Sequence, residues 1–304
     1  MNHLKMIALA TALGLSTAAA TAQGPGVTTI ASYPHGNFLE NLSIDKSGRL
    51  LFTSYIAKTI FLWRGSGAPT PLVTLDVHPV AVLARAKDVI VTAHGKSFAE
   101  GPAFTKTNQF LILDRTGKLK KRIPAPDALF LNGMVELSPT VILAADSLGQ
   151  KIWAFNPTTC QITEWLSDPL LGPDPVNPSQ KPGANGLKLK DGMLYISNSA
   201  RGAIYRVAIA KAKSTGTMEL FAKSGPIDDF AFLSDGSIAA ATHGKNLVRI
   251  VGDHITDIIP DGCDSCTSVV PYGRGNSLIV LTTGNLVEGG TAPARMLHVR
   301  SPVR

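Results

Sequence analysis

The stretch Asn185-Gly186-Leu187-Lys188-Leu189-Lys190-Asp191-Gly192 alternates polar and apolar residues and ends in a turn that contains glycine. A second apolar run follows it, and a third begins at Ile204, 19 residues after Asn185. Three more stretches share this pattern and nearly this spacing, and they begin at Glu40, Asn132 and Asp228. A fixed period of short alternating strands is typical of a propeller, whose blades repeat one four-stranded sheet.

Two weaker copies complete the array. They begin near Pro79 and Thr267, so the six starts lie about 45 residues apart, the usual length of a blade. The last copy runs out of chain after its third strand. We expect Val27–Tyr33 to supply the missing strand, because closure hides two exposed sheet edges. The sequence therefore predicts an all-β fold, a six-bladed β-propeller closed by an N-terminal strand, in a single domain over residues 23–304.

The composition agrees with such a fold and argues against two classes of partner. With 28 Gly and 20 Pro, the chain favours many tight turns over helices. The net charge of +7 is spread out, and its densest run, Lys118 to Arg122, falls on an outer hairpin without interleaved aromatic residues, which does not favour nucleic-acid binding. Residues 23–304 contain no run of about 20 apolar residues, so we expect no membrane span there. Nothing in the sequence indicates the oligomeric state.

Residues 1–22 have the pattern of a signal peptide. Lys5 precedes an apolar run, Met6–Leu15, and Ala20-Thr21-Ala22 forms a small-residue cleavage site before Gln23. This pattern predicts a secreted or periplasmic protein. In such a compartment we expect Cys263 and Cys266 to form a disulfide and Cys160 to stay free. The alternative, a zinc half-site, would need a second pair of ligands that the chain does not offer.

Polar residues begin four of the repeats, and propeller geometry gathers them at one end of the central channel. These residues are Glu40, Asn132, Asn185 and Asp228. The ends of the second strands fall on the same face, and they carry Ser54, Asp146, Ser199 and His243. Three long connections also belong to this face, namely 95–108, 168–184 and 284–294, and long loops over a rigid scaffold are where binding sites are usually built.

Two carboxylates and two amides form a set of hard oxygen ligands. We expect Glu40, Asn132, Asn185 and Asp228 to hold a divalent cation, Ca²⁺ in preference to Mg²⁺ or Mn²⁺. Asp228, Asp146 and His243 are the candidate catalytic residues, because they could take a proton from an attacking water. The alternative is that these polar residues only fix turns by bonding to nearby backbone.

The quoted motifs resemble those of the SMP-30/gluconolactonase/LRE-like six-bladed propellers over nearly the whole mature chain. The best matches are Asn132-Gly133-Met134 and Asn185-Gly186-Leu187, each with the strand that follows it. The resemblance implies a cation held by Glu40, Asn132 and either Asp228 or Asn185. The first motif departs from the family, since it reads Glu-Asn-Leu where Glu-Gly-Pro is common. Other motifs, such as Gly225-Pro226-Ile227-Asp228-Asp229-Phe230, are closer to the branch that includes hetero-Diels–Alderase-like proteins.

Three functions follow as hypotheses. The first is a metal-dependent hydrolase of lactones or related esters that acts on a small-molecule substrate at the channel mouth. The second is a metal-free pocket for a hydrophobic small molecule, lined by residues such as Phe98, Phe104 and Leu286 and able to guide a cycloaddition. The third is a non-enzymatic interaction scaffold, a role that the propeller fold also serves.

Overall fold

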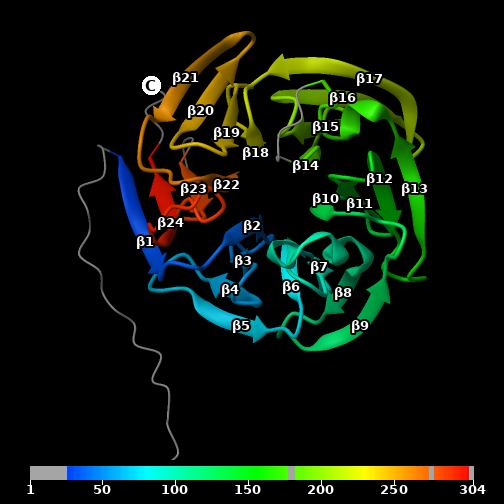
Figure 1. Cartoon of the computed structure of the whole chain (residues 1–304), viewed down its shortest axis with the longest axis horizontal. Coiled ribbons are helices and arrows are strands. Elements are labelled where there is room, and N and C mark those ends of the chain that lie inside the picture. Colours follow the sequence, from blue (N-terminus) through cyan, green and yellow to red (C-terminus); the bar gives the residue numbers. More distant parts are fainter. Residues whose placement is uncertain (1–25, 177–181, 274–276, 301–304) are drawn as a thin grey trace, which may run out of the picture.

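The computed structural model describes residues 26–176, 182–273 and 277–300. The predicted signal peptide, residues 1–22, lies outside this part of the chain. The strands form six four-stranded sheets arranged around a central axis, each with its first strand innermost (Figure 1). The sequence prediction of six blades is confirmed.

The first three blades follow one another without interruption along the chain. Blade one is β2 (Leu39–Ile44), β3 (Leu50–Ser54), β4 (Thr59–Trp63) and β5 (Thr70–Thr74). Blade two is β6 (His78–Ala84), β7 (Val89–His94), β8 (Asn108–Leu113) and β9 (Leu119–Pro124), with the short 3₁₀ helices η1 (Phe98–Glu100) and η2 (Pro102–Lys106) between β7 and β8. Blade three is β10 (Leu131–Ser138), β11 (Val141–Asp146), β12 (Lys151–Phe155) and β13 (Ile162–Ser167), followed by the 3₁₀ helix η3 (Pro169–Leu171).

The remaining blades include the closure of the ring. Blade four is β14 (Ala184–Lys190), β15 (Met193–Asn198), β16 (Ala203–Ala210) and β17 (Lys213–Lys223). Blade five is β18 (Ile227–Phe232), β19 (Ile238–Thr242), β20 (Leu247–Val251) and β21 (His254–Ile259). Blade six is β22 (Cys266–Pro271), β23 (Leu278–Thr282), β24 (Ala294–Val299) and the N-terminal strand β1 (Val27–Tyr33).

The N-terminal strand closes the propeller as the sequence predicts. β1 pairs antiparallel with β24, from Val27 opposite Val299 to Tyr33 opposite Ala294. The first and last strands of the described chain therefore meet in one sheet, and blade six has four strands like the other blades.

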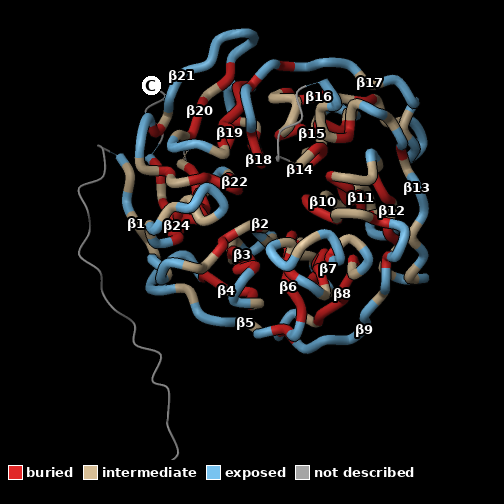
Figure 2. Tube along the Cα trace, in the orientation of Figure 1, coloured by how far each residue is buried: buried red, intermediate tan, exposed pale blue. Residues whose placement is uncertain are grey.

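The core lies between the blades. Each pair of neighbouring blades encloses its own cluster of buried aliphatic and aromatic residues. The inner strands are mostly buried and the outer strands mostly exposed (Figure 2). No helix in the described ranges is long and apolar enough to cross a membrane.

Hydroxyl groups tie neighbouring blades together beside the channel. Thr53 donates to the carbonyl of Val80 in the next blade at 2.8 Å, and Thr92 donates to the carbonyl of Asn132 at 3.1 Å. These bonds satisfy carbonyl groups that lie off the sheet ladder, and they fix the spacing of the innermost strands around the channel.

Candidate functional site

The innermost strands share an irregularity at the end where the candidate site lies. In all six blades the pairing of the first and second strands shifts register near the start of the first strand. In blade one, for example, Leu39 pairs with Ser54 and Leu42 pairs with Phe52, which leaves Glu40 and Asn41 off the ladder. Such bulges re-aim side chains and recur next to active sites.

The register defines one equivalent position per blade, the residue that directly follows the last pair before the bulge. We call these positions the mouth ring, and they are occupied by Glu40, Val80, Asn132, Asn185, Asp228 and Thr267. The four polar residues predicted from the sequence therefore occupy equivalent positions. In blade two the register places Val80 there, one residue beyond Pro79.

The Asn-Gly motifs of blades three and four are explained by close packing at the mouth. A Cβ atom on Gly133 would lie 2.4 Å from the carbonyl oxygen of Asn185, and one on Gly186 would lie 2.4 Å from Oδ1 of Asp229. Any side chain at either glycine would force the neighbouring blades apart, so glycine must follow each asparagine.

A second set of side chains follows the second strand of each blade and contacts the mouth ring. Asn132 Nδ2 donates to Ser147 Oγ at 3.2 Å, and Asn185 Nδ2 donates to Ser199 Oγ at 3.3 Å. In blade five, Nε2 of His243 lies 3.9 Å from Oδ2 of Asp228. The predicted neighbours Ser199 and His243 are thus next to the ring, and Ser147 joins them.

The hydrogen bonds fix which end of each ring amide faces its serine. Ser147 Oγ donates to the carbonyl of Ala184 at 2.5 Å, and Ser199 Oγ donates to the carbonyl of Ile227 at 2.7 Å. Because each serine gives its only proton to a carbonyl, it must accept from the asparagine. Asn132 and Asn185 therefore turn their NH₂ groups toward the serines and their oxygens the other way.

Glu40 is an acid of the ring whose pKa is strongly raised. Its Oε2 atom is buried and has no hydrogen-bond partner in the described part of the chain. Burial, together with the negative charge of Asp229, raises the pKa of Glu40 to about 8. A cation within reach of this carboxyl group would favour its ionised form.

Asp229 is a member of the site that the sequence analysis missed. Its carboxylate pairs with Lys188 of blade four through Oδ1 and accepts from Ser268 of blade six at 2.9 Å through Oδ2. Only 4% of its side chain is exposed, and its charge acts on Glu40 of blade one. Asp229 thus links four blades around the channel.

Asp146, a predicted catalytic residue, directly precedes Ser147, the residue that contacts the mouth ring. Its oxygens accept from the backbone NH groups of Leu129, Phe130 and Gly149 and from Nε1 of Trp153, at 2.8 to 3.0 Å. These contacts hold the loop between blades two and three, which favours the turn-fixing alternative for this residue. These contacts do not support the predicted role of Asp146 in proton transfer, which stays a prediction.

The mouth is aromatic on the side of blades one and two. Tyr55 and His94 occupy the positions that correspond to Ser147 and His243, and the Tyr55 hydroxyl lies 3.0 Å from His94 Nδ1. Phe98 stacks on Tyr55 with ring centroids 4.7 Å apart. Phe38, Tyr55 and Val80 form one buried cluster against which Phe98 and Leu286 pack. Burial lowers the pKa of His94 to about 3, so this histidine is neutral.

A disulfide loop joins the two sides of the mouth. Cys263 and Cys266 are bonded, as the sequence predicts, and both are fully buried. Between them, Ser265 donates through its backbone to the carbonyl of Gly244 at 2.9 Å and accepts from the backbone of Thr283 at 2.9 Å. The loop therefore contacts both the turn after His243 and the connection that carries Leu286.

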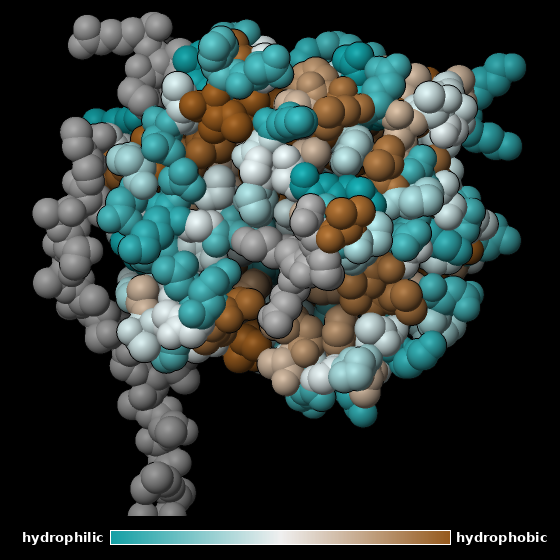
Figure 3. All heavy atoms as spheres, turned by 45° about the horizontal axis from the view of Figure 1, so that its top comes forward, coloured by the Kyte–Doolittle hydropathy of each residue, from teal (hydrophilic) through white to brown (hydrophobic). Residues whose placement is uncertain are grey.

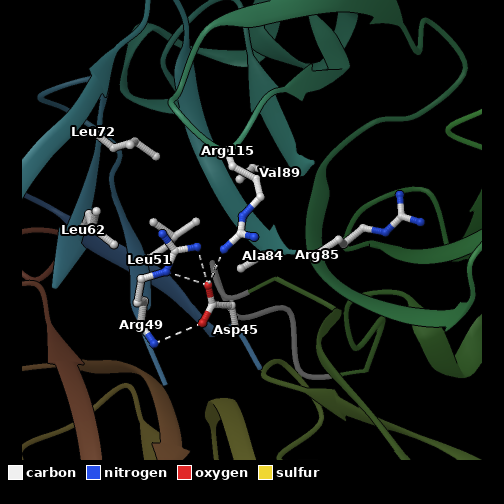
Figure 4. A pocket seen from close by; sticks show the side chains of 9 residues that line it. All are labelled: Asp45, Arg49, Leu51, Leu62, Leu72, Ala84, Arg85, Val89 and Arg115. Atoms are coloured by element: carbon white, nitrogen blue, oxygen red, sulfur yellow. Dashed lines mark hydrogen bonds and ion pairs between the residues drawn. The ribbon is translucent and has the colours of Figure 1, made fainter. Parts of the chain in front are cut away.

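On the opposite face of the propeller, the described residues between blades one and two include a cluster of ion pairs. Asp45, in the β2–β3 turn, pairs with Arg49 at 2.6 Å and with Arg115 at 3.4 Å beside a small cavity between blades one and two (Figure 4). Partial burial opposes its ionisation, but hydrogen bonds from Ser47 and Arg49 outweigh this effect and lower the pKa of Asp45 to about 2. The Asp45 carboxylate on this face is thus stabilised by the neighbouring arginines.

Among the described residues, no three His, Cys, Asp or Glu side chains form a group that could hold a metal ion. A site built from these residues therefore depends on the amide oxygens of Asn132 and Asn185 as well as on carboxylates.

Comparisons with known proteins establish the fold. No protein-family model matches the sequence, and no curated protein matches it significantly. A structure of a luciferin-regenerating enzyme matches with a TM-score of 0.67 and 13% identity, over 92% of this chain and 96% of that one. A gluconolactonase from Xanthomonas campestris matches with 0.66 and 13%, over 91% and 89%. A calcium-binding protein, regucalcin, from Agrobacterium tumefaciens matches with 0.60 and 14%, over 90% and 95%. The chain thus has the six-bladed propeller fold of the SMP-30/gluconolactonase/LRE-like proteins that its sequence resembles.

Proposed function

We propose that this protein hydrolyses lactones or related esters at the channel mouth, with a divalent cation held by Glu40, Asn132, Asn185 and Asp228. The observation that carries the proposal is the buried, unpartnered Oε2 of Glu40 in a ring of oxygen-bearing side chains. The shared fold with a gluconolactonase and with a calcium-binding regucalcin supports it.

The donor set fits a hard cation, Ca²⁺ in preference to Mg²⁺ or Mn²⁺. The fixed amides of Asn132 and Asn185 present oxygen rather than nitrogen away from their serines. Glu40 carries a carboxyl group whose ionisation lacks a counter-charge. When bound, the cation would supply Lewis-acid polarisation of the ester carbonyl.

The protein's own side chains would handle the proton. His243 Nε2 and Asp228 Oδ2 are 3.9 Å apart, a separation at which one water molecule could hydrogen-bond to both. As that water attacks the carbonyl carbon, His243 Nε2 takes its proton and then returns it to the leaving alkoxide. Asp228 stabilises the imidazolium that forms in between.

The test is turnover of a lactone panel by chelated protein, before and after Ca²⁺ is restored. We expect Glu40→Gln to abolish the Ca²⁺-dependent rate, and Asp45→Asn, at the other end of the channel, to leave that rate unchanged. Full activity of the chelated wild type, or of Glu40→Gln, would contradict the proposal.

A second candidate is a metal-free pocket for a hydrophobic small molecule. The observation that favours it is the apolar cluster of Phe38, Tyr55, Val80, Phe98 and Leu286 beside the ring. This candidate predicts that a chelator leaves ligand binding or turnover untouched.

We also propose that the protein is exported and that residues 1–22 are removed. The buried Cys263–Cys266 disulfide supports an oxidising compartment. Amino-terminal sequencing of protein from the native host should begin at or near Gln23. Recovery of soluble cytoplasmic protein that retains Met1 would contradict export.

A further inference from the structure

One side of the channel mouth is a continuous aromatic surface. We call it the aromatic wall and define it as Phe38, Tyr55, Val80, Phe98, Phe104, Phe130 and Leu286. Ring centroids are 5.7 Å apart between Phe38 and Phe98, and 5.3 Å apart between Phe104 and Phe130. His94 connects the two groups, since its ring lies 5.7 Å from that of Tyr55 and 4.9 Å from that of Phe130.

The aromatic wall lies next to the proposed reaction centre. Val80 occupies the mouth-ring position of blade two, the neighbour of Glu40 in blade one. The charge of Glu40 contributes, after burial, to the raised pKa of Tyr55, which places the two side chains close together. A molecule whose ester group lies at Glu40 would therefore place its adjoining part against the aromatic wall.

The polar side-chain group of the aromatic wall is the Tyr55 hydroxyl, and it is already paired within the protein. Nε2 of the adjoining His94 has no partner among the described residues, but this atom is buried. The Tyr55 hydroxyl accepts from the backbone NH of Phe98 at 3.0 Å, and this leaves its own proton for His94 Nδ1. A substrate hydroxyl placed against this surface would lose its bonds to water without gaining a partner, which costs about 1–3 kcal/mol for each buried group. An apolar group would gain contact area instead.

Two loops contribute Phe98 and Leu286 to the aromatic wall, and both side chains are partly exposed. Phe98 begins η1, which is held by a capping box between Ser97 and Glu100. Leu286 comes from the connection in blade six, and the next residue, Val287, is 62% exposed. Phe98, Phe130 and Leu286 are only half-buried, so part of each side chain stays uncovered. Apolar patches also interrupt the hydrophilic surface of the face shown in Figure 3.

We infer that the substrate is a lactone or ester that carries an aromatic or alkyl group, and that the aromatic wall selects it over polyhydroxylated lactones. This inference rests on the proposed function, because it specifies the substrate class of the same site. Glu40, Asn132, Asn185 and Asp228 would face the reacting group, while the aromatic wall beside them offers carbon to the remainder of the molecule.

The experiment compares kcat/KM for a phenyl-substituted and a polyhydroxylated lactone of equal ring size. The wild type should prefer the phenyl lactone at least tenfold. Phe98→Ala should reduce that preference about tenfold by raising KM for the phenyl lactone alone, and Leu286→Ala should act in the same direction. Phe221→Ala, on the exposed outer strand β17, is the matched control and should change neither rate.

Equilibrium binding separates failure of this inference from failure of the proposed function. A phenyl-substituted lactam, which resists hydrolysis, is titrated into the wild type and Phe98→Ala by calorimetry. Binding by the wild type that weakens about tenfold in Phe98→Ala supports the aromatic wall, even if no lactone is turned over. Preference for the polyhydroxylated lactone, equal loss for both substrates in Phe98→Ala, or no lactam binding overturns the inference.

Discussion

The position after the second strand carries polar side chains in blades three to five and aromatic rings in blades one and two. After the second strand, the former carry Ser147, Ser199 and His243, whereas the latter carry Tyr55 and His94. On the polar side each of these residues contacts a mouth-ring residue of its own blade. On the aromatic side Tyr55 and His94 bond to each other across the blade boundary.

This difference between the blades shows that the position in the repeat determines where a side chain lies but does not determine its role. His243 and His94 are equivalent by register, yet His94 is fully buried among aromatic rings and neutral, while His243 faces a carboxylate. Function in this propeller is therefore assigned by the neighbours of a position.

The largest expected effect tests the two equivalent histidines. His243→Gln should lower kcat for lactone hydrolysis by about 100-fold or more, because it removes the group proposed to take the proton. His94→Gln should instead lower the free energy of unfolding by about 1–3 kcal/mol while kcat changes little, because it disturbs buried packing. Steady-state kinetics and urea unfolding of both variants check this. An equal loss of kcat in the two variants would contradict the different roles assigned to the two histidines.

A second prediction concerns the loop that joins the two sides. Replacing Cys263 and Cys266 by Ser should lower the free energy of unfolding by about 2 kcal/mol, the loss expected for so short a closed loop. It should also raise KM, since Ser265 contacts the backbone next to His243 and Thr283. Thermal melts with and without reductant measure the first effect. Melting of the wild type that is insensitive to complete reduction would contradict it.

A third prediction addresses the orientation of the ring amides. Ser147→Ala should weaken Ca²⁺ binding about tenfold, because the amide of Asn132 is then free to turn its NH₂ group toward the ion. Thr53→Val, which removes an interblade bond on the aromatic side, should cost about 1 kcal/mol of stability without altering Ca²⁺ affinity. Calorimetric titration distinguishes these outcomes, and equal affinities in the two variants would argue against a role for the amide.

The sequence was sufficient for the repeat and its closure. Alternation, turn glycines and spacing predicted six blades and placed the closing strand at Val27–Tyr33, because these features depend on local chain geometry. The four polar ring positions followed from the same repeat.

The orientation of residues at the ring could not be predicted in the same way. Alternation of side chains fails where the register shifts, and the shift falls at the site in every blade. This is why Val80 stands where Pro79 was expected, and why Ser147 rather than Asp146 contacts the ring. The role of Asp229 depends on Lys188 and Ser268 from other blades, contacts that no local pattern reveals.

The smallest expected effect is a pH dependence of stability from Glu40. Its pKa is raised from an ordinary 4.5 to about 8 in the folded protein. The protonated carboxyl thus stabilises the folded state fully below about pH 4.5, and this contribution is lost as the pH rises through about 8. In chelated protein the wild type should lose about 1 kcal/mol or more relative to Glu40→Gln between pH 5 and pH 9, because the folded carboxyl releases its proton at a higher pH than the unfolded one. Urea unfolding at several pH values checks this, and parallel curves would refute it.

Titration of chelated protein with Ca²⁺ by calorimetry tests the central claim most directly. We predict saturable binding of one ion by the wild type, loss of that binding in Glu40→Gln, and unchanged binding in Asp45→Asn. A wild type that shows no saturable heat with Ca²⁺, Mg²⁺ or Mn²⁺, or a Glu40→Gln variant that binds Ca²⁺ as the wild type does, would contradict a cation site at the channel mouth.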